Sequence, residues 1–160
     1  MRTLHVASLA MLLSLSIEFA LGMANNLFGS FPATSDPQVA LRSANGLLLA
    51  HLVVAFLLLV FSVVVAVLAA RTPIPKRVTA LGIAGVVVVF ATIESGIEFI
   101  LSGFSENLWS YSMAMGFLFA VIVYGALGLR SALEGGRGFP FPALTDRRTD
   151  ADDTPRGSIG

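Results

Sequence analysis

The chain has no cysteine, little charge and a single tryptophan among its 160 residues. Without cysteine it cannot form disulfides, use a thiolate nucleophile or bind zinc or an iron–sulfur cluster through sulfur. Charged residues make up 12% of the sequence, whereas a soluble domain has about 25%. The formal net charge is zero, so no excess of positive charge indicates nucleic acid as a partner. Phosphate-binding glycine loops and the nucleophile elbow of hydrolases are also missing.

Hydrophobic residues, by contrast, make up 56% of the chain, and they gather in four long runs. A helix needs about 20 apolar residues to cross a bilayer, and each run is long enough. We place the predicted spans near Leu4–Ala24, Gly46–Ala70, Val78–Ser102 and Trp109–Leu129. The sequence therefore predicts an all-α fold, a membrane-embedded antiparallel four-helix bundle over residues 1–130. Residues 131–160 have too little apolar surface to fold alone, so we expect a disordered, flexible cytoplasmic tail.

Two segments near the first span leave alternatives open. The basic start Met1-Arg2 and the small residues Gly22-Met23-Ala24 loosely fit a cleaved signal peptide. Glu18 inside the apolar run, and the length of that run, favour a retained span instead. The following segment, Asn25 to Asn45, has no clear periodicity and is predicted to be the longest loop.

Basic residues set the predicted orientation. They lie before the first span, between the second and third, and after the fourth, which are segments on the same side of the membrane. Only Arg42 falls on the other side. Because basic loops stay in the cytoplasm, both termini are expected to be cytoplasmic. The basic residues on that side are Arg2, Arg71, Lys76, Arg77, Arg130, Arg137, Arg147, Arg148 and Arg156.

Three glutamates lie inside the apolar runs, with no lysine or arginine beside them: Glu18, Glu94 and Glu98. A carboxylate at a helix centre costs roughly 2.5–3.5 kcal/mol on insertion, so each is a candidate functional residue. With the predicted orientation, they share a layer with His51 about 6–13 Å below the outer surface, at 1.5 Å of rise per residue.

Helical spacing suggests which faces look into the bundle. Glu94 and Glu98 stack on one face because they are four residues apart. Stripes of small and polar residues indicate close helix contacts in the other spans. We therefore predict a pocket at the outer mouth formed by Glu18, His51, Glu94 and Glu98. The stripes are Ser14, Glu18, Gly22 and Asn25 in the first span, His51, Ala55 and Ser62 in the second, and Gly116, Ala120 and Tyr124 in the fourth.

The ligand of this pocket is open. Three acids face at most one imidazolium, so either some glutamates are protonated or a cation balances them. Glu18, His51, Glu94 and Glu98 would suit a divalent metal such as manganese, iron or zinc, or a proton relay. As a purely structural alternative, protonated glutamates would bond to Asn25, Ser95 or Ser112 and tie the helices together.

Methionines offer two further possibilities, both built on His51. Copper(I) would bind His51 together with Met23, Met113 and Met115. A haem would need His51 and one of these methionines, for example Met113, as axial ligands. The other histidine, His5, is no candidate because it lies roughly 20 Å away along the membrane normal.

Two resemblances extend these possibilities. The run Ala50-His51-Leu52-Val53-Val54-Ala55-Phe56-Leu57-Leu58 resembles the histidine-bearing helix of haem A synthases, whose half-size members have four spans. This resemblance implies a haem-related or redox enzyme with His51 as an axial ligand. However, the loop after the first span has no glutamate, and the fourth span has no histidine, where that family has functional residues.

A longer pattern is similar to small four-span bacterial and archaeal membrane proteins of unassigned activity. It includes Glu18 to Phe28, Pro32, His51, Glu98-Phe99-Ile100 and Ser112 to Met115. This resemblance implies no mechanism. From the pocket, we expect a prokaryotic plasma membrane protein that binds a cation, protons or a cofactor, or a haem-related enzyme, or a structural subunit. A homo-oligomer or a larger membrane complex fits each of these, and no catalytic residue stands out.

Overall fold

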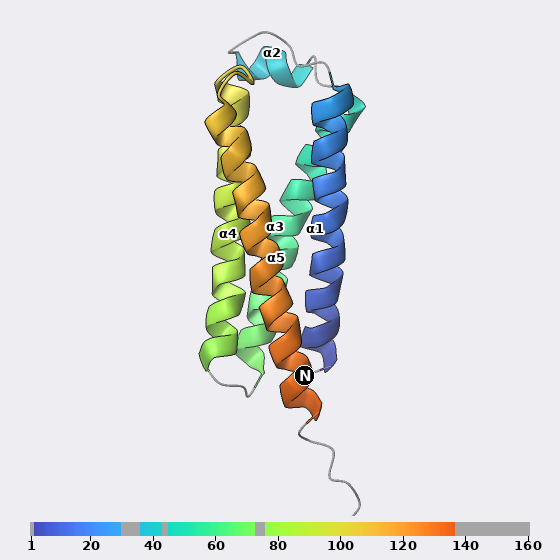
Figure 1. The fold of residues 1–160 in the computed structure, drawn as a ribbon, viewed down its shortest axis with the longest axis vertical. Helices are drawn as coiled ribbons and strands as arrows, with labels where there is room; N and C mark the ends of the chain where they lie inside the picture. The colour runs from blue at the N-terminus through green and yellow to red at the C-terminus, as the bar shows by residue number, and fades with distance from the viewer. Residues whose placement is uncertain (1, 30–35, 43–44, 73–75, 137–160) are drawn as a thin grey trace, which may run out of the picture.

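The computed structural model describes residues 2–29, 36–42, 45–72 and 76–136. They form the helices α1 (Arg2–Phe28), α2 (Pro37–Arg42), α3 (Gly46–Arg71), α4 (Lys76–Leu101) and α5 (Asn107–Gly136), with no strand in these ranges (Figure 1). All except α2 are long and apolar enough to cross a membrane. The chain has the architecture of a multi-pass membrane protein.

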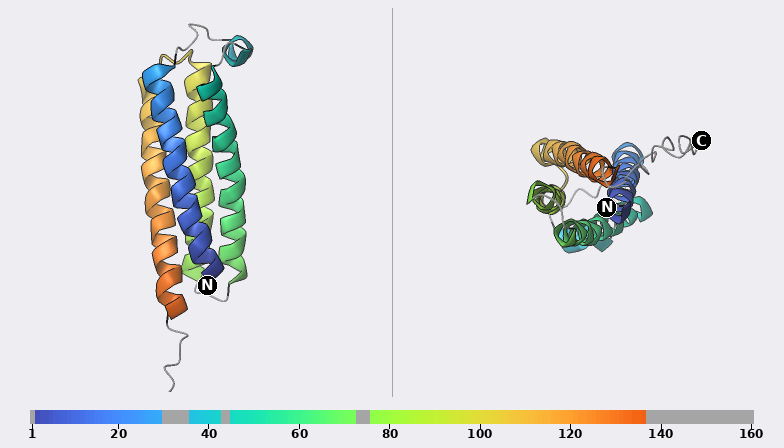
Figure 2. Two further views of the ribbon diagram at one scale, coloured as in Figure 1. Left: turned by 90° about the vertical axis from the view of Figure 1, so that its right-hand side faces the viewer. Right: turned by 90° about the horizontal axis from the view of Figure 1, so that it is seen from below.

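The four long helices form a closed ring. Each contacts two others, in the order α1, α3, α4, α5 and back to α1 (Figure 2). Neighbours in this ring run in opposite directions, which confirms the predicted all-α antiparallel bundle. The start of α1 lies at the same end as the last turns of α5, whereas α2 lies across the opposite end (Figure 1).

The helices differ from the predicted spans most clearly in three places. The α1 helix continues past Ala24 to Phe28, and the predicted loop contains α2, where the Asp36 carboxylate accepts from the Gln38 amide at 2.9 Å. The α5 helix continues past Leu129 to Gly136, because its last turns contain good helix formers and bury Ser131. The predicted tail therefore begins as helix, and its remainder, 137–160, lies outside the described residues.

Local signals explain two helix ends. The Asn45 side chain caps α3 by accepting a hydrogen bond from the Leu48 amide at 2.8 Å. At the end of α4, Gly103 and Phe104 have positive φ angles of 68° and 60°. The Phe104 amide then donates back to the Phe99 carbonyl at 3.0 Å, which closes the helix. This turn sets the Phe104 ring edge-on to that of Phe99, with 5.5 Å between centroids.

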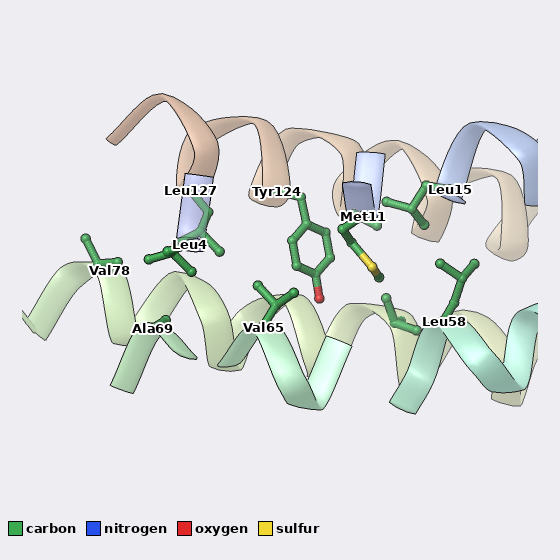
Figure 3. Close-up of a cluster of buried hydrophobic side chains, with 11 residues drawn as sticks. Leu4, Met11, Leu15, Leu58, Val65, Ala69, Val78, Tyr124 and Leu127 are labelled. Atoms are coloured by element: carbon green, nitrogen blue, oxygen red, sulfur yellow. The ribbon is translucent and has the colours of Figure 1, made fainter. Parts of the chain in front are cut away.

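The hydrophobic core fills the half of the bundle away from α2. Tyr124 is fully buried there and extends from α5 toward α3 and α4 (Figure 3). Gly85 makes room for it, since a β-carbon on Gly85 would lie 2.6 Å from the Tyr124 hydroxyl. Large apolar side chains also cover the outside of the bundle, as for Leu13 (64% exposed) and Val87 (60% exposed). An apolar exterior of this kind suits contact with lipid.

Candidate functional site

A cavity of about 410 Å³ lies between the four long helices, in the half of the bundle nearest α2. Leu15, Leu58, Val89 and Ala120, one from each helix, belong both to its wall and to the core below, so they form its floor. Most of the wall is apolar. The polar side chains of the wall are Glu18, Asn25, Asn26, His51, Thr92 and Ser110.

One close polar contact in the cavity joins α1 and α3. Nδ1 of His51 lies 2.9 Å from Oε1 of Glu18, and the two side chains are only 25% and 12% exposed. Gly22 lies one turn after Glu18 and leaves room for the His51 imidazole, because a β-carbon at position 22 would lie 3.2 Å from Cε1 of His51. Of the predicted inward stripes in these two helices, Glu18, Gly22, Asn25, His51 and Ala55 line the cavity, whereas Ser14 and Ser62 do not.

Two buried acceptor atoms in the cavity wall lack partners. Oε2 of Glu18 and Oδ1 of Asn25 have no hydrogen-bond partner within the described part of the chain. A buried acceptor without a donor costs about 1–3 kcal/mol. Both residues line the cavity, whose wall is otherwise largely apolar.

Aromatic and sulfur-containing side chains form the rest of the wall nearest α5. Phe19 of α1 stacks on Phe117 of α5 with ring centroids 4.6 Å apart. Met113, half-buried, lines the cavity beside Gly96, whose β-carbon would lie 3.3 Å from the Met113 sulfur. Met113 and Met23 thus share the cavity with His51, whereas Met115 does not line it.

Glu94 and Glu98 do not join this site. Both are exposed, and neither lines the cavity. The inward face of α4 instead carries Thr92 and Gly96. Because a helix turns by about 100° per residue, each glutamate, two positions after one of these, points away from the cavity. This corrects the expectation that four side chains share one pocket.

The ligand set predicted for a divalent metal is accordingly not assembled. Within the described ranges, no three His, Asp or Glu side chains come together to hold a metal ion. Among the residues that the structure describes, the Ser95 hydroxyl donates to the Ala91 carbonyl of its own helix at 3.0 Å and has no hydrogen bond with a glutamate. Metal binding by Glu18, His51, Glu94 and Glu98 stays a prediction without geometric support.

The second histidine lies in a separate part of the bundle. Nδ1 of His5, at the start of α1, donates to the Gly128 carbonyl of α5 at 3.0 Å. His5 is therefore occupied in helix packing and is remote from the cavity near α2, in agreement with its exclusion as a partner of His51.

Comparison of the chain with protein-family models, curated proteins and solved structures finds no match. The resemblances to haem A synthases and to small four-span membrane proteins stay predictions. The function is therefore argued from the geometry of the cavity.

Proposed function

We propose that the protein binds a small, mainly apolar molecule that carries a hydrogen-bond donor, in the cavity beside Glu18 and His51. The observation that carries this proposal is the pair of unpartnered acceptors, Oε2 of Glu18 and Oδ1 of Asn25, in a largely apolar wall. Ligand sites are typically apolar cavities of about 300–1,000 Å³ with a few placed polar groups. The cavity, at about 410 Å³, fits that description.

The free oxygens of the wall favour a donor on the ligand. Oε1 of Glu18 faces Nδ1 of His51 at 2.9 Å, so Oε2 is the carboxylate oxygen left open to a ligand. The amide oxygen of Asn25 accepts in every state. A hydroxyl or amine head group with an apolar body satisfies both the acceptors and the wall.

The proposal also includes the position of the cavity relative to the membrane. Basic residues gather at the end of the bundle opposite α2, and the positive-inside rule assigns that end to the cytoplasm. The cavity would then open in the outer half of a prokaryotic plasma membrane, where a lipid-soluble ligand enters from the bilayer.

Two matched probes test the proposal. The full-length protein in lipid nanodiscs is dialysed to equilibrium against 2-naphthol or naphthalene, with empty nanodiscs measuring partition into lipid. The two probes differ by one hydroxyl donor. Because a hydrogen bond to a buried acceptor contributes about 1 kcal/mol or somewhat more, we expect 2-naphthol to bind about fivefold to tenfold more tightly. Equal affinities, or no binding above empty nanodiscs, would refute the proposal.

Substitutions assign the preference to the cavity. Glu18→Leu and Asn25→Leu each remove one unpartnered acceptor, so both should reduce the advantage of 2-naphthol while naphthalene still binds. Glu94→Leu is the matched control, because it removes a carboxylate from an exposed position that does not line the cavity. Loss of the advantage in Glu94→Leu as well would contradict the assignment.

A haem-related function is the second candidate, favoured by one observation. His51 of α3 and Met113 of α5 line the same cavity, and both side-chain types serve as axial ligands of haem iron. The absorption spectrum of the protein purified from cells supplied with haem precursors tests it. A Soret band that disappears in His51→Ala and shifts in Met113→Leu would support this candidate, and its absence would refute it.

A further inference from the structure

A second hollow lies far from the cavity, at the end of the bundle opposite α2. It has a volume of about 680 Å³ and runs between the start of α4 and the last turns of α5. Arg77 of α4 and Arg130 of α5 line it, together with Glu134. Its remaining wall is apolar and comes from Val78, Ala80, Leu81 and Ala84. We call this hollow the arginine groove.

The charges of the arginine groove have no partner among the described residues. In that part of the chain, the pair of His51 with Glu18 is the one charged contact, so Arg77, Arg130 and Glu134 form no ion pair there. Both arginines are exposed. Two guanidinium groups and one carboxylate leave the groove with a formal charge of +1, which a group with a single negative charge would balance.

We propose that the arginine groove binds one anionic phospholipid. A phosphodiester carries one negative charge and matches the fork of N–H donors on a guanidinium, which binds phosphate in two-point contacts. Arg77 and Arg130 hold the phosphate from two neighbouring helices. Glu134 accepts from a head-group hydroxyl, and it disfavours a second negative charge. Basic pockets between helices on the cytoplasmic side are known to bind such head groups.

The apolar wall points to a lipid and not to a free phosphate. Ala80 and Ala84 are four residues apart and share one face of α4 with Val87, which is 60% exposed. This face leads from the arginines along the outside of the bundle. An acyl chain attached to the phosphate lies along it, whereas a soluble phosphate leaves the apolar wall uncovered.

Native mass spectrometry of the full-length protein tests the proposal, with lipids of identical acyl chains titrated in. We expect dioleoyl phosphatidylglycerol to bind as a single retained molecule, and dioleoyl phosphatidylethanolamine and glycerol 3-phosphate to bind at least tenfold more weakly. Equal retention of the two phospholipids would overturn the choice of an anionic lipid. Equal retention of glycerol 3-phosphate would overturn the role of the acyl chain.

A pair of double variants separates the groove from general attraction to basic residues. Arg77→Gln/Arg130→Gln should weaken phosphatidylglycerol binding about 25-fold, at about fivefold per basic residue. Arg71→Gln/Lys76→Gln removes the same charge from exposed positions at the same end of the bundle, outside the groove. It should change binding less than threefold. Equal losses in both variants would overturn the proposal, and thermal melting of each verifies folding. The probes and residues differ from those of the cavity, so either proposal can fail alone.

Discussion

Gly22 of α1 lies directly against the imidazole of His51 of α3: a β-carbon on this glycine would be 3.2 Å from Cε1 of the ring. The contact explains how the ring reaches Glu18, one turn earlier on α1, at 2.9 Å. A β-carbon at position 22 would push the ring by a few tenths of an ångström, and a larger side chain would push it further. The Glu18–His51 distance is therefore sensitive to a third residue, which has no side chain.

Substitution of Gly22 should disturb the site more than the fold. Alanine leaves a contact tight enough to shift the imidazole by a few tenths of an ångström, and valine requires a larger displacement. We expect Gly22→Val to reduce 2-naphthol binding at least fivefold and Gly22→Ala to reduce it less. Equilibrium dialysis measures both. Gly125→Ala is the matched control, since a β-carbon at Gly125 meets nothing within 4 Å; a comparable loss there would refute the role of the Gly22 contact.

A second close approach, between α4 and α5, predicts coupled effects on stability. A β-carbon on Gly116 would overlap Oγ1 of Thr92, whose hydroxyl donates to the Val88 carbonyl at 2.8 Å. Gly116→Ala should therefore lower the free energy of unfolding by about 1–3 kcal/mol, the usual cost of overpacking.

A double-mutant cycle tests this contact. Thr92→Ala removes the overlapping oxygen, so Gly116→Ala should cost about 1–2 kcal/mol less in that background than in the native one. Reversible unfolding in mixed micelles supplies the four free energies. Additive effects of the two substitutions would show that the helices separate freely at this point.

The bundle was predictable because the sequence patterns that specify it extend over whole helices. Four apolar runs give the number of spans. Basic residues before the first run, between the second and third runs, and after the fourth run give the antiparallel order of the spans. Helix ends were less predictable, since they depend on short-range contacts. The Phe104 amide bond to Phe99 and the burial of Ser131 are tertiary details that composition does not reveal.

The candidate site was predictable in three of the four long helices, where small residues mark the inward face. Gly22, Ala55 and Ala120 each line the cavity. Other members of the same stripes do not line it, namely Ser14, Ser62, Gly116 and Tyr124. For α4, the prediction followed the glutamates and not the small residues. Gly82, Gly85 and Gly96, spaced at helical intervals, mark the face that packs against Ala66, Tyr124 and Met113. Those glycines were the signal that could have placed Glu94 and Glu98 on the opposite side.

The exposed glutamates yield a direct prediction. Because Glu94 and Glu98 do not line the cavity, Glu94→Gln/Glu98→Gln should leave 2-naphthol affinity unchanged within twofold in equilibrium dialysis. Asn25→Leu, examined in parallel, should reduce it. A loss in the double glutamine variant equal to that in Asn25→Leu would mean that the outer face of α4 takes part in binding.

Metal removal distinguishes the proposed ligand site from a metal site. Three His, Asp or Glu side chains do not come together anywhere in the described ranges, and a closed divalent site usually needs at least that many protein ligands. We therefore expect dialysis against EDTA to leave 2-naphthol affinity unchanged. Elemental analysis before and after dialysis gives the metal content, and Glu18→Gln reports whether any metal depends on the pair. A stoichiometric metal that is lost in Glu18→Gln, together with weaker probe binding after EDTA, would mean that Glu18 and His51 bind a cation first and the apolar ligand through it.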